Sequence, residues 1–147
     1  MLCGHATAKV DDKGRFKVPS EFASGLEELC GGERRVYVTS RDTQRILIYP
    51  WPLWIEHLAA LKKLPSADPL AERLRLAINF WGRETQIDPQ GRIRIHSELL
   101  RAVGIDGTIS VFGMTDMLEI WDQERVHAMR PRLDSAELAQ IADKYGI

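Results

Sequence analysis

Two short segments of the chain combine aspartate, glycine and arginine at the same spacing. The segment "VDDKGRFKVPSEF" spans residues 10–22, and "IDPQGRIRIHSEL" spans residues 87–99, which is 77 residues later. In each segment an arginine follows an aspartate by four positions. The planar guanidinium group of arginine has donors that suit phosphate oxygens or the O6 and N7 atoms of guanine. The repeated segment therefore indicates an anionic ligand, with nucleic acid the leading candidate.

The first residues of each segment predict a tight turn. An aspartate at the start of a turn accepts hydrogen bonds from turn amides, and a glycine adopts positive φ without steric cost. The aspartate could also hold the arginine four residues later through a salt bridge. We expect four residues to close the turns and orient the arginines: Asp11, Gly14, Asp88 and Gly91.

A short strand should follow each turn. Side chains of a strand alternate between two faces, so Phe16 and Val18, or Ile93 and Ile95, share one apolar face. The basic residues between them share the opposite face. A turn needs no arginine and a hairpin needs no basic outer face. Because both features occur in both copies of the segment, they indicate a binding function and not only the formation of a stable turn. The predicted DNA-binding residues are Lys9, Lys13, Arg15, Lys17, Arg92 and Arg94.

Catalysis is the alternative use of these side chains. Asp11 and Asp88 could form an acid–base pair, and His96 could activate Ser97. The aspartates lie on equivalent surface turns where nothing would raise their pKa values, and His96 has no evident orienting group. The four histidines have no metal-ligand spacing, and the chain has no phosphate-binding glycine motif. We predict that the protein is not an enzyme, with no catalytic residues, metal or cofactor.

Composition indicates a folded protein and excludes some classes. Of 147 residues, 44% are hydrophobic and 28% are charged, as in globular proteins. The net charge of −1 gives no global attraction to nucleic acid, but residues 1–20 have four cations against two acids, whereas residues 105–147 have eight acids against four cations. Two distant cysteines indicate neither a redox motif nor a zinc site. No apolar run is long enough to span a bilayer and no signal peptide is recognisable, so we expect a cytoplasmic protein with no membrane partner.

The duplication predicts an architecture of two small modules related by a pseudo-twofold axis, each too small to be stable alone. Each copy should contain a strand, the turn, a second strand, a short helix, a hairpin and a further helix. Between the copies, the segment at residues 70–81 predicts a packing helix with one apolar stripe, and residues 134–147 predict a short amphipathic helix. The stripe consists of Leu70, Leu74, Ala77, Ile78 and Trp81.

The segments "DDKGRFKVPSEF", "RILIYPWPLW", "DPQGRIRIHSELL" and "MLEIWDQERV", in this order and spacing, resemble the MraZ family of bacterial transcriptional regulators, which are built from two SpoVT-AbrB-type repeats. The resemblance covers residues 1 to about 130. Its signature positions are Asp11, Arg15, Asp88 and Arg92. Two departures concern the second copy. Gln90 stands where the first copy has Lys13, so the two turns need not contact DNA equally, and His96 stands where the first copy has Pro19, which leaves the exit from that strand less rigid.

The resemblance implies an α+β fold of duplicated swapped-hairpin, AbrB-like β modules with short helices, assembled as a ring-shaped homo-oligomer. It implies a first repeat at residues 5–52, connecting helices at 53–81, a second repeat at 82–125 and a C-terminal helix and tail at 126–147. The implied function is regulation of the protein's own division and cell-wall operon. Its partner would be double-stranded DNA at repeated promoter sites, and its location the nucleoid.

One alternative from another class remains open. The duplicated Asp–Arg turns could lie at subunit interfaces of a protein-interaction or scaffolding oligomer that binds no DNA. Substitution of Arg15 would then change the size of the assembly instead of its DNA affinity.

Overall fold

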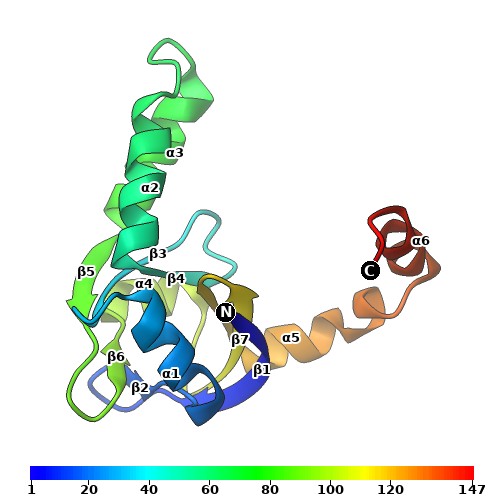
Figure 1. Ribbon diagram of the computed structural model, residues 1–147, viewed down its shortest axis with the longest axis horizontal. Coiled ribbons are helices and arrows are strands. Elements are labelled where there is room, and N and C mark those ends of the chain that lie inside the picture. The colour runs from blue at the N-terminus through cyan, green and yellow to red at the C-terminus, as the bar shows by residue number, and fades with distance from the viewer.

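The computed structural model describes residues 1–147, which form an α+β fold with two antiparallel sheets (Figure 1). The larger sheet has six strands in the order β1-β7-β8-β4-β3-β5, and the smaller one pairs β2 with β6. The predicted fold class, α+β, is confirmed. The strands are β1 (Leu2–Lys9), β2 (Arg15–Lys17), β3 (Arg35–Thr39), β4 (Ile46–Pro50), β5 (Arg83–Gln86), β6 (Arg92–Arg94), β7 (Thr108–Thr115) and β8 (Leu118–Asp122).

Strand pairing in the larger sheet crosses between the two halves of the chain. β1 pairs along its whole length with β7, from Leu2 opposite Thr115 to Lys9 opposite Thr108. In the same way β5 pairs with β3, and β4 pairs with β8 at the middle of the sheet. Each half therefore contributes strands that complete the other half. β1 begins at Leu2, before residue 5, where the first repeat was expected to start.

The helices cover the sheet or project from it. They are α1 (Ser20–Leu29), α2 (Trp51–Lys62), α3 (Pro69–Phe80), α4 (Ser97–Val103), α5 (Gln123–Met129), the 3-10 helix η1 (Arg130–Leu133) and α6 (Ala136–Lys144). In Figure 1, α2 and α3 extend together from one side of the body, and α5, η1 and α6 extend as an arm in another direction. None of these helices combines the length and the apolar character needed to cross a bilayer.

The main core lies where α1, α4 and both sheets meet. It contains 20 buried residues, and Phe16 and Ile93 at the centre of the smaller sheet are 0% exposed. These two residues lie opposite each other across β2 and β6. Burial of both side chains anchors two very short strands that would not pair stably alone.

A second, smaller core joins the larger sheet to α2 and α3. It is formed by Leu47, Tyr49, Trp54 and Ile78, with Tyr37 stacked on Trp54 at a ring-centroid distance of 4.0 Å. The predicted helix at residues 70–81 is present as α3. The predicted packing stripe is correct for Ile78 but wrong for Leu70, which is 68% exposed because it lies in the first turn, at the tip of the projecting pair.

Candidate nucleic-acid interface

The two segments with aspartate, glycine and arginine form matching turns at residues 11–15 and 88–92, called here the Asp–Arg turns. In the first, the amide of Asp11 donates to the carbonyl oxygen of Arg15 at 2.8 Å, and the amide of Gly14 donates back to the carbonyl of Asp11 at 3.0 Å. The second turn has the same two bonds at 2.9 Å. Gly14 and Gly91 both have a φ of +78°, a conformation that favours glycine.

Each aspartate holds its turn and its arginine with two separate oxygens. Oδ1 of Asp11 accepts from the amides of Lys13 and Arg15 at 3.0 and 2.9 Å, while Oδ2 accepts from Nε of Arg15 at 2.9 Å. In the second turn, Oδ2 of Asp88 accepts from Nε of Arg92 at 2.7 Å. The structure shows no other hydrogen bond from either guanidinium group, so both terminal Nη groups remain free to donate.

These contacts keep the aspartates ionised. The backbone amide of Arg15 is the main cause that lowers the pKa of Asp11 below its ordinary value, with the Arg15 side chain adding to the effect. The amide and side chain of Arg92 lower the pKa of Asp88 in the same way. A general acid near neutral pH needs a raised carboxyl pKa, so this environment is the opposite of the one that acid–base catalysis requires.

The pairing of β2 with β6 gathers the cations of both copies. Arg15 lies opposite Arg94, and Lys17 lies opposite Arg92, while the residues between them are buried in the core. The two strands, called here the ribbon, therefore carry four cationic side chains on one face. Like charges placed directly across an antiparallel pair are destabilising. The aspartate of each turn already offsets one cation of each cross-strand pair. An anionic partner would offset the other cation, which makes the ribbon face the strongest candidate for an anion-binding surface.

The remaining predicted residues lie near the ends of the ribbon. Lys13 is exposed within the first Asp–Arg turn, where the second turn has Gln90. Lys9 is exposed at the end of β1, two residues before the first turn. The structure thus brings Arg15, Lys17, Arg92 and Arg94 onto one face, with Lys13 and Lys9 flanking it on the side of the first copy.

Sequence reasoning did not identify the ribbon. The sequence predicts a separate basic face for each copy, whereas the structure joins the two faces into one. The signal that could have revealed it is the repeat itself, because a pseudo-twofold axis can place equivalent short strands of two copies side by side.

His96 has a structural environment. Its Nε2 atom is 2.9 Å from the carbonyl oxygen of Trp81, which ties the start of α4 to the end of α3. The structure shows no hydrogen bond between His96 and Ser97, and it contains no group of three or more histidine, cysteine, aspartate or glutamate side chains that could hold a metal ion.

Comparison with known proteins agrees with this combination of fold and site. Residues 82–145 match the family described as "MraZ protein, putative antitoxin-like". Proteins named "Transcriptional regulator MraZ" match most of the chain. Those from Acidobacterium capsulatum and Koribacter versatilis are 30% and 32% identical, over 84% and 86% of this chain and 84% and 85% of their own. The protein of that name from Herpetosiphon aurantiacus is 31% identical over 100% of both chains.

The fold and the site define an α+β protein with a duplicated Asp–Arg turn and a cationic two-stranded ribbon. The similarity to these relatives identifies its family: the chain belongs to the MraZ family.

Proposed function

We propose that the protein is a sequence-specific DNA-binding transcriptional regulator whose ribbon contacts double-stranded DNA. The observation that carries this proposal is the cross-strand pairing of Arg15 with Arg94 and of Lys17 with Arg92. A two-stranded β-ribbon fits the major groove of DNA, and arginine is the side chain best suited to the edge of guanine. The curated relatives, named transcriptional regulators, support the same function.

We propose that the Asp–Arg turns give the ribbon its specificity for DNA sequence. Nε of each arginine is held by an aspartate, so the side chain is positioned before it meets DNA and less rotamer freedom is lost on binding. Exposed Lys13 and Lys9 would contact phosphates beside the first turn. Because Gln90 replaces a lysine in the second turn, we propose that the first turn contributes more to affinity.

A single ribbon offers few contacts to DNA, so we propose that several chains assemble to bind it together. We propose that each chain is a duplication of a swapped-hairpin module, with repeats at residues 5–52 and 82–125, connecting helices at 53–81 and a C-terminal tail at 126–147. The reciprocal pairing of β1 with β7 and of β5 with β3 supports this. Chains would form a ring and bind repeated sites in the promoter of their own division and cell-wall operon, in the cytoplasmic nucleoid. Every engagement after the first is then intramolecular, which raises affinity.

The test is fluorescence anisotropy with DNA from the region upstream of the protein's own gene, at two salt concentrations. Arg15→Ala and Arg92→Ala are compared with wild type, and Arg41→Ala serves as the matched control because Arg41 is exposed in the turn between β3 and β4. We expect Arg15→Ala to weaken binding by about 1–3 kcal/mol, roughly 5- to 150-fold, and Arg92→Ala by less. The control should bind as wild type does.

Oligomer size, measured in parallel by light scattering, separates the proposal from its alternative. If Arg15→Ala leaves DNA affinity unchanged but alters the size of the assembly, the turns belong to a subunit interface and the scaffolding function is correct. If scrambled DNA binds as tightly as the upstream DNA, sequence-specific recognition is excluded.

A further inference from the structure

Arg34, the residue immediately before β3, has a backbone conformation that arginine rarely adopts. Its φ is +54°, and the other residues with positive φ that are not glycine are Thr43 and Thr115. A residue with a Cβ is sterically disfavoured in this left-handed region, whereas glycine is not. The course of the backbone alone therefore does not account for an arginine at this position.

The second copy has a glycine at the equivalent position. The amide of Ile87 donates to the carbonyl oxygen of Arg34 at 2.7 Å. In the same way, the amide of Val10 donates to the carbonyl oxygen of Gly107 at 2.9 Å. Gly107 lies immediately before β7 and also has a positive φ, of +112°. Because glycine meets the same backbone requirement without strain, the arginine of the first copy is best explained by its side chain.

Arg34 lies beside the second Asp–Arg turn, although it belongs to the first copy. Ile87, which donates to its carbonyl oxygen, directly precedes Asp88, the first residue of that turn. In Figure 1 the segment that leads from α1 into β3 runs beside β5, on the side of the body where β6 also lies. The pairing of strands between the halves therefore places a side chain of one copy near the turn of the other.

The second turn has fewer cations of its own than the first. Lys9, at the end of β1, flanks the first turn, and the equivalent residue at the end of β5 is the neutral Gln86. Within the turns, Gln90 stands where the first copy has Lys13. Arg34 therefore supplies a positive charge beside the turn that lacks these two lysines.

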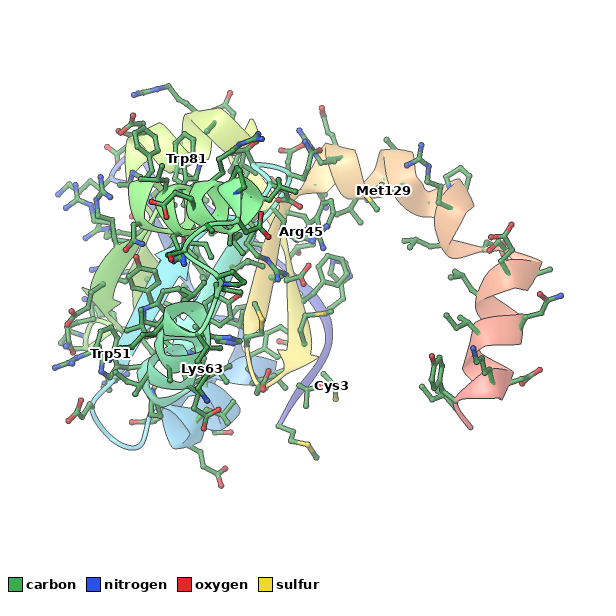
Figure 2. All side chains as sticks on the ribbon, turned by 90° about the horizontal axis from the view of Figure 1, so that it is seen from above. Cys3, Arg45, Trp51, Lys63, Trp81 and Met129 are labelled. Carbon is green, nitrogen blue, oxygen red and sulfur yellow. The ribbon has the colours of Figure 1, made fainter.

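The guanidinium group of Arg34 has no partner in the chain. Its Nε atom is buried without a hydrogen-bond acceptor, and the structure shows no ion pair from its side chain. By contrast, Nε of Arg35 lies 3.2 Å from a carboxylate oxygen of Glu84, and its guanidinium group lies 4.8 Å from the ring centroid of Trp51, which is labelled in Figure 2. The thiol of Cys30 gives Arg34 no counter-charge, because burial raises the pKa of that thiol to about 11.

We propose that Arg34 contacts a phosphate group of DNA beside the second Asp–Arg turn. This inference rests on the proposed DNA-binding function and adds to it a contact from outside the ribbon and the turns. The planar guanidinium group donates to two phosphate oxygens at once, and phosphate contacts position a protein on the duplex without reading its sequence. The contact gives the second turn a flanking cation, as Lys9 does for the first.

Fluorescence anisotropy with DNA from the region upstream of the protein's own gene, measured over a range of salt concentrations, tests this contact. Arg34→Asn removes the charge and suits the backbone, because asparagine adopts positive φ more readily than most side chains. We expect it to weaken binding several-fold, to the same extent on upstream and scrambled DNA. The slope of the logarithm of the binding constant against the logarithm of salt concentration should become shallower by about one, as loss of one phosphate contact requires. Arg34→Lys should retain most of that slope.

Arg41→Asn is the matched control. Arg41 is exposed beyond the opposite end of β3, so this variant loses the same charge at a distance from the second turn. Its salt slope should equal that of wild type. Equal effects of the two variants would mean that net charge, and not a contact at Arg34, determines the slope, and would overturn the inference.

A purely structural role for Arg34 predicts a different result. A cation near the C-terminal end of α1 can stabilise that helix through its dipole. In that case Arg34→Asn would lower the melting temperature and leave DNA affinity unchanged, which would contradict the inference. We expect the opposite, because asparagine relieves the backbone strain: the melting temperature, followed by circular dichroism, should be at least that of wild type while DNA affinity falls.

The same measurements separate this inference from the proposed function. If wild type binds and Arg15→Ala weakens binding, but Arg34→Asn changes neither affinity nor salt slope, the ribbon binds DNA without Arg34 and this inference alone is wrong. If wild type shows no salt-dependent binding to DNA, both are wrong.

Discussion

At the scale of single residues, the Asp–Arg pair is the unit that we propose to act on DNA, and its value is positional. Both pairs are about one-third exposed, and ion pairs at such sites are screened by water and add little stability. Their geometry is nevertheless the same in the two copies, with one carboxylate oxygen on the turn amides and the other on Nε. An arrangement that gives little stability but appears twice is best explained by the terminal guanidinium nitrogens that it presents.

Replacement of Asp11 by asparagine should separate the two roles of the carboxylate. The amide oxygen of asparagine still accepts from the turn amides, but its NH₂ group does not accept from Nε of Arg15. We expect the melting temperature to change little and DNA affinity to fall several-fold, by anisotropy. Asp12→Asn is the control, because Asp12 is exposed beside it and forms no hydrogen bond or ion pair through its side chain. Equal losses in both variants would contradict a role in orienting Arg15.

The carboxyl groups also predict a pH dependence. Their folded-state pKa values lie below the ordinary value of 3.8, so their contribution to stability is fully present above that pH and is lost as the pH falls through the folded-state pKa values. NMR titration of the carboxyl groups measures both values directly. In Arg15→Ala the pKa of Asp11 should rise only part of the way to 3.8, because the backbone amide of residue 15 is the main cause of the lowered pKa and is still present. A full return to 3.8 would contradict this assignment.

At the scale of elements, the ribbon depends on bonds that cross between the copies. The amide of Ile95 donates to the carbonyl of Gly14 at 2.7 Å, and the amide of Val18 donates to the carbonyl of Gly91 at 2.9 Å. Each Asp–Arg turn is therefore tied to the strand that follows the other turn. This explains how strands of three residues hold four cations on one face: the buried Phe16 and Ile93 supply the packing, and the turns extend the hydrogen-bond pattern.

The two turn glycines should respond differently to alanine. Both have a φ of +78°, which costs a residue with a Cβ about 1–2 kcal/mol. A Cβ at Gly14 would also lie 2.4 Å from the carbonyl oxygen of Ile95, whereas one at Gly91 meets nothing within 4 Å. Urea unfolding should therefore show a larger loss of stability for Gly14→Ala than for Gly91→Ala. Equal losses would mean that positive φ alone decides the cost.

At the scale of the whole molecule, the two halves are not independent. β1 of the first half pairs with β7 of the second, and β5 of the second half pairs with β3 of the first. Each half alone would therefore lack one edge strand of its sheet. The central pairing of β4 with β8 joins the halves into one sheet. Although the sequence is duplicated, we therefore expect the fold to unfold as a single cooperative unit.

A cut chain tests this cooperativity. A protease site placed in the segment between α2 and α3, residues 63–68, should yield fragments that stay together and keep the circular dichroism of the intact protein. The isolated fragment 82–147 should be largely unfolded, because it lacks β1 beside β7, β4 beside β8 and Phe16 beside Ile93. A dispersed NMR spectrum from that fragment alone would show that the second repeat folds independently.

Local chemistry made much of this fold predictable. Aspartate and glycine at fixed positions identified both turns, alternation separated Phe16 and Val18 from Arg15 and Lys17, and apolar spacing located the helix at residues 70–81. These features involve residues close together in the chain, where backbone preferences and side-chain periodicity act directly. The spacing of Asp11 and Arg15 likewise indicated an ion pair that the structure contains.

Strand partners and uncovered surfaces followed from contacts between distant residues. Arg15 and Arg94 are 79 positions apart, and nothing in either segment specifies that they lie opposite each other. Their pairing depends on the burial of Phe16 against Ile93 and on the exchange of β1 and β5 between the halves, which are properties of the whole core. The exposure of Leu70 and of the apolar face of α6 has the same origin, because periodicity predicts that a helix has an apolar side, whereas long-range packing decides whether anything covers it.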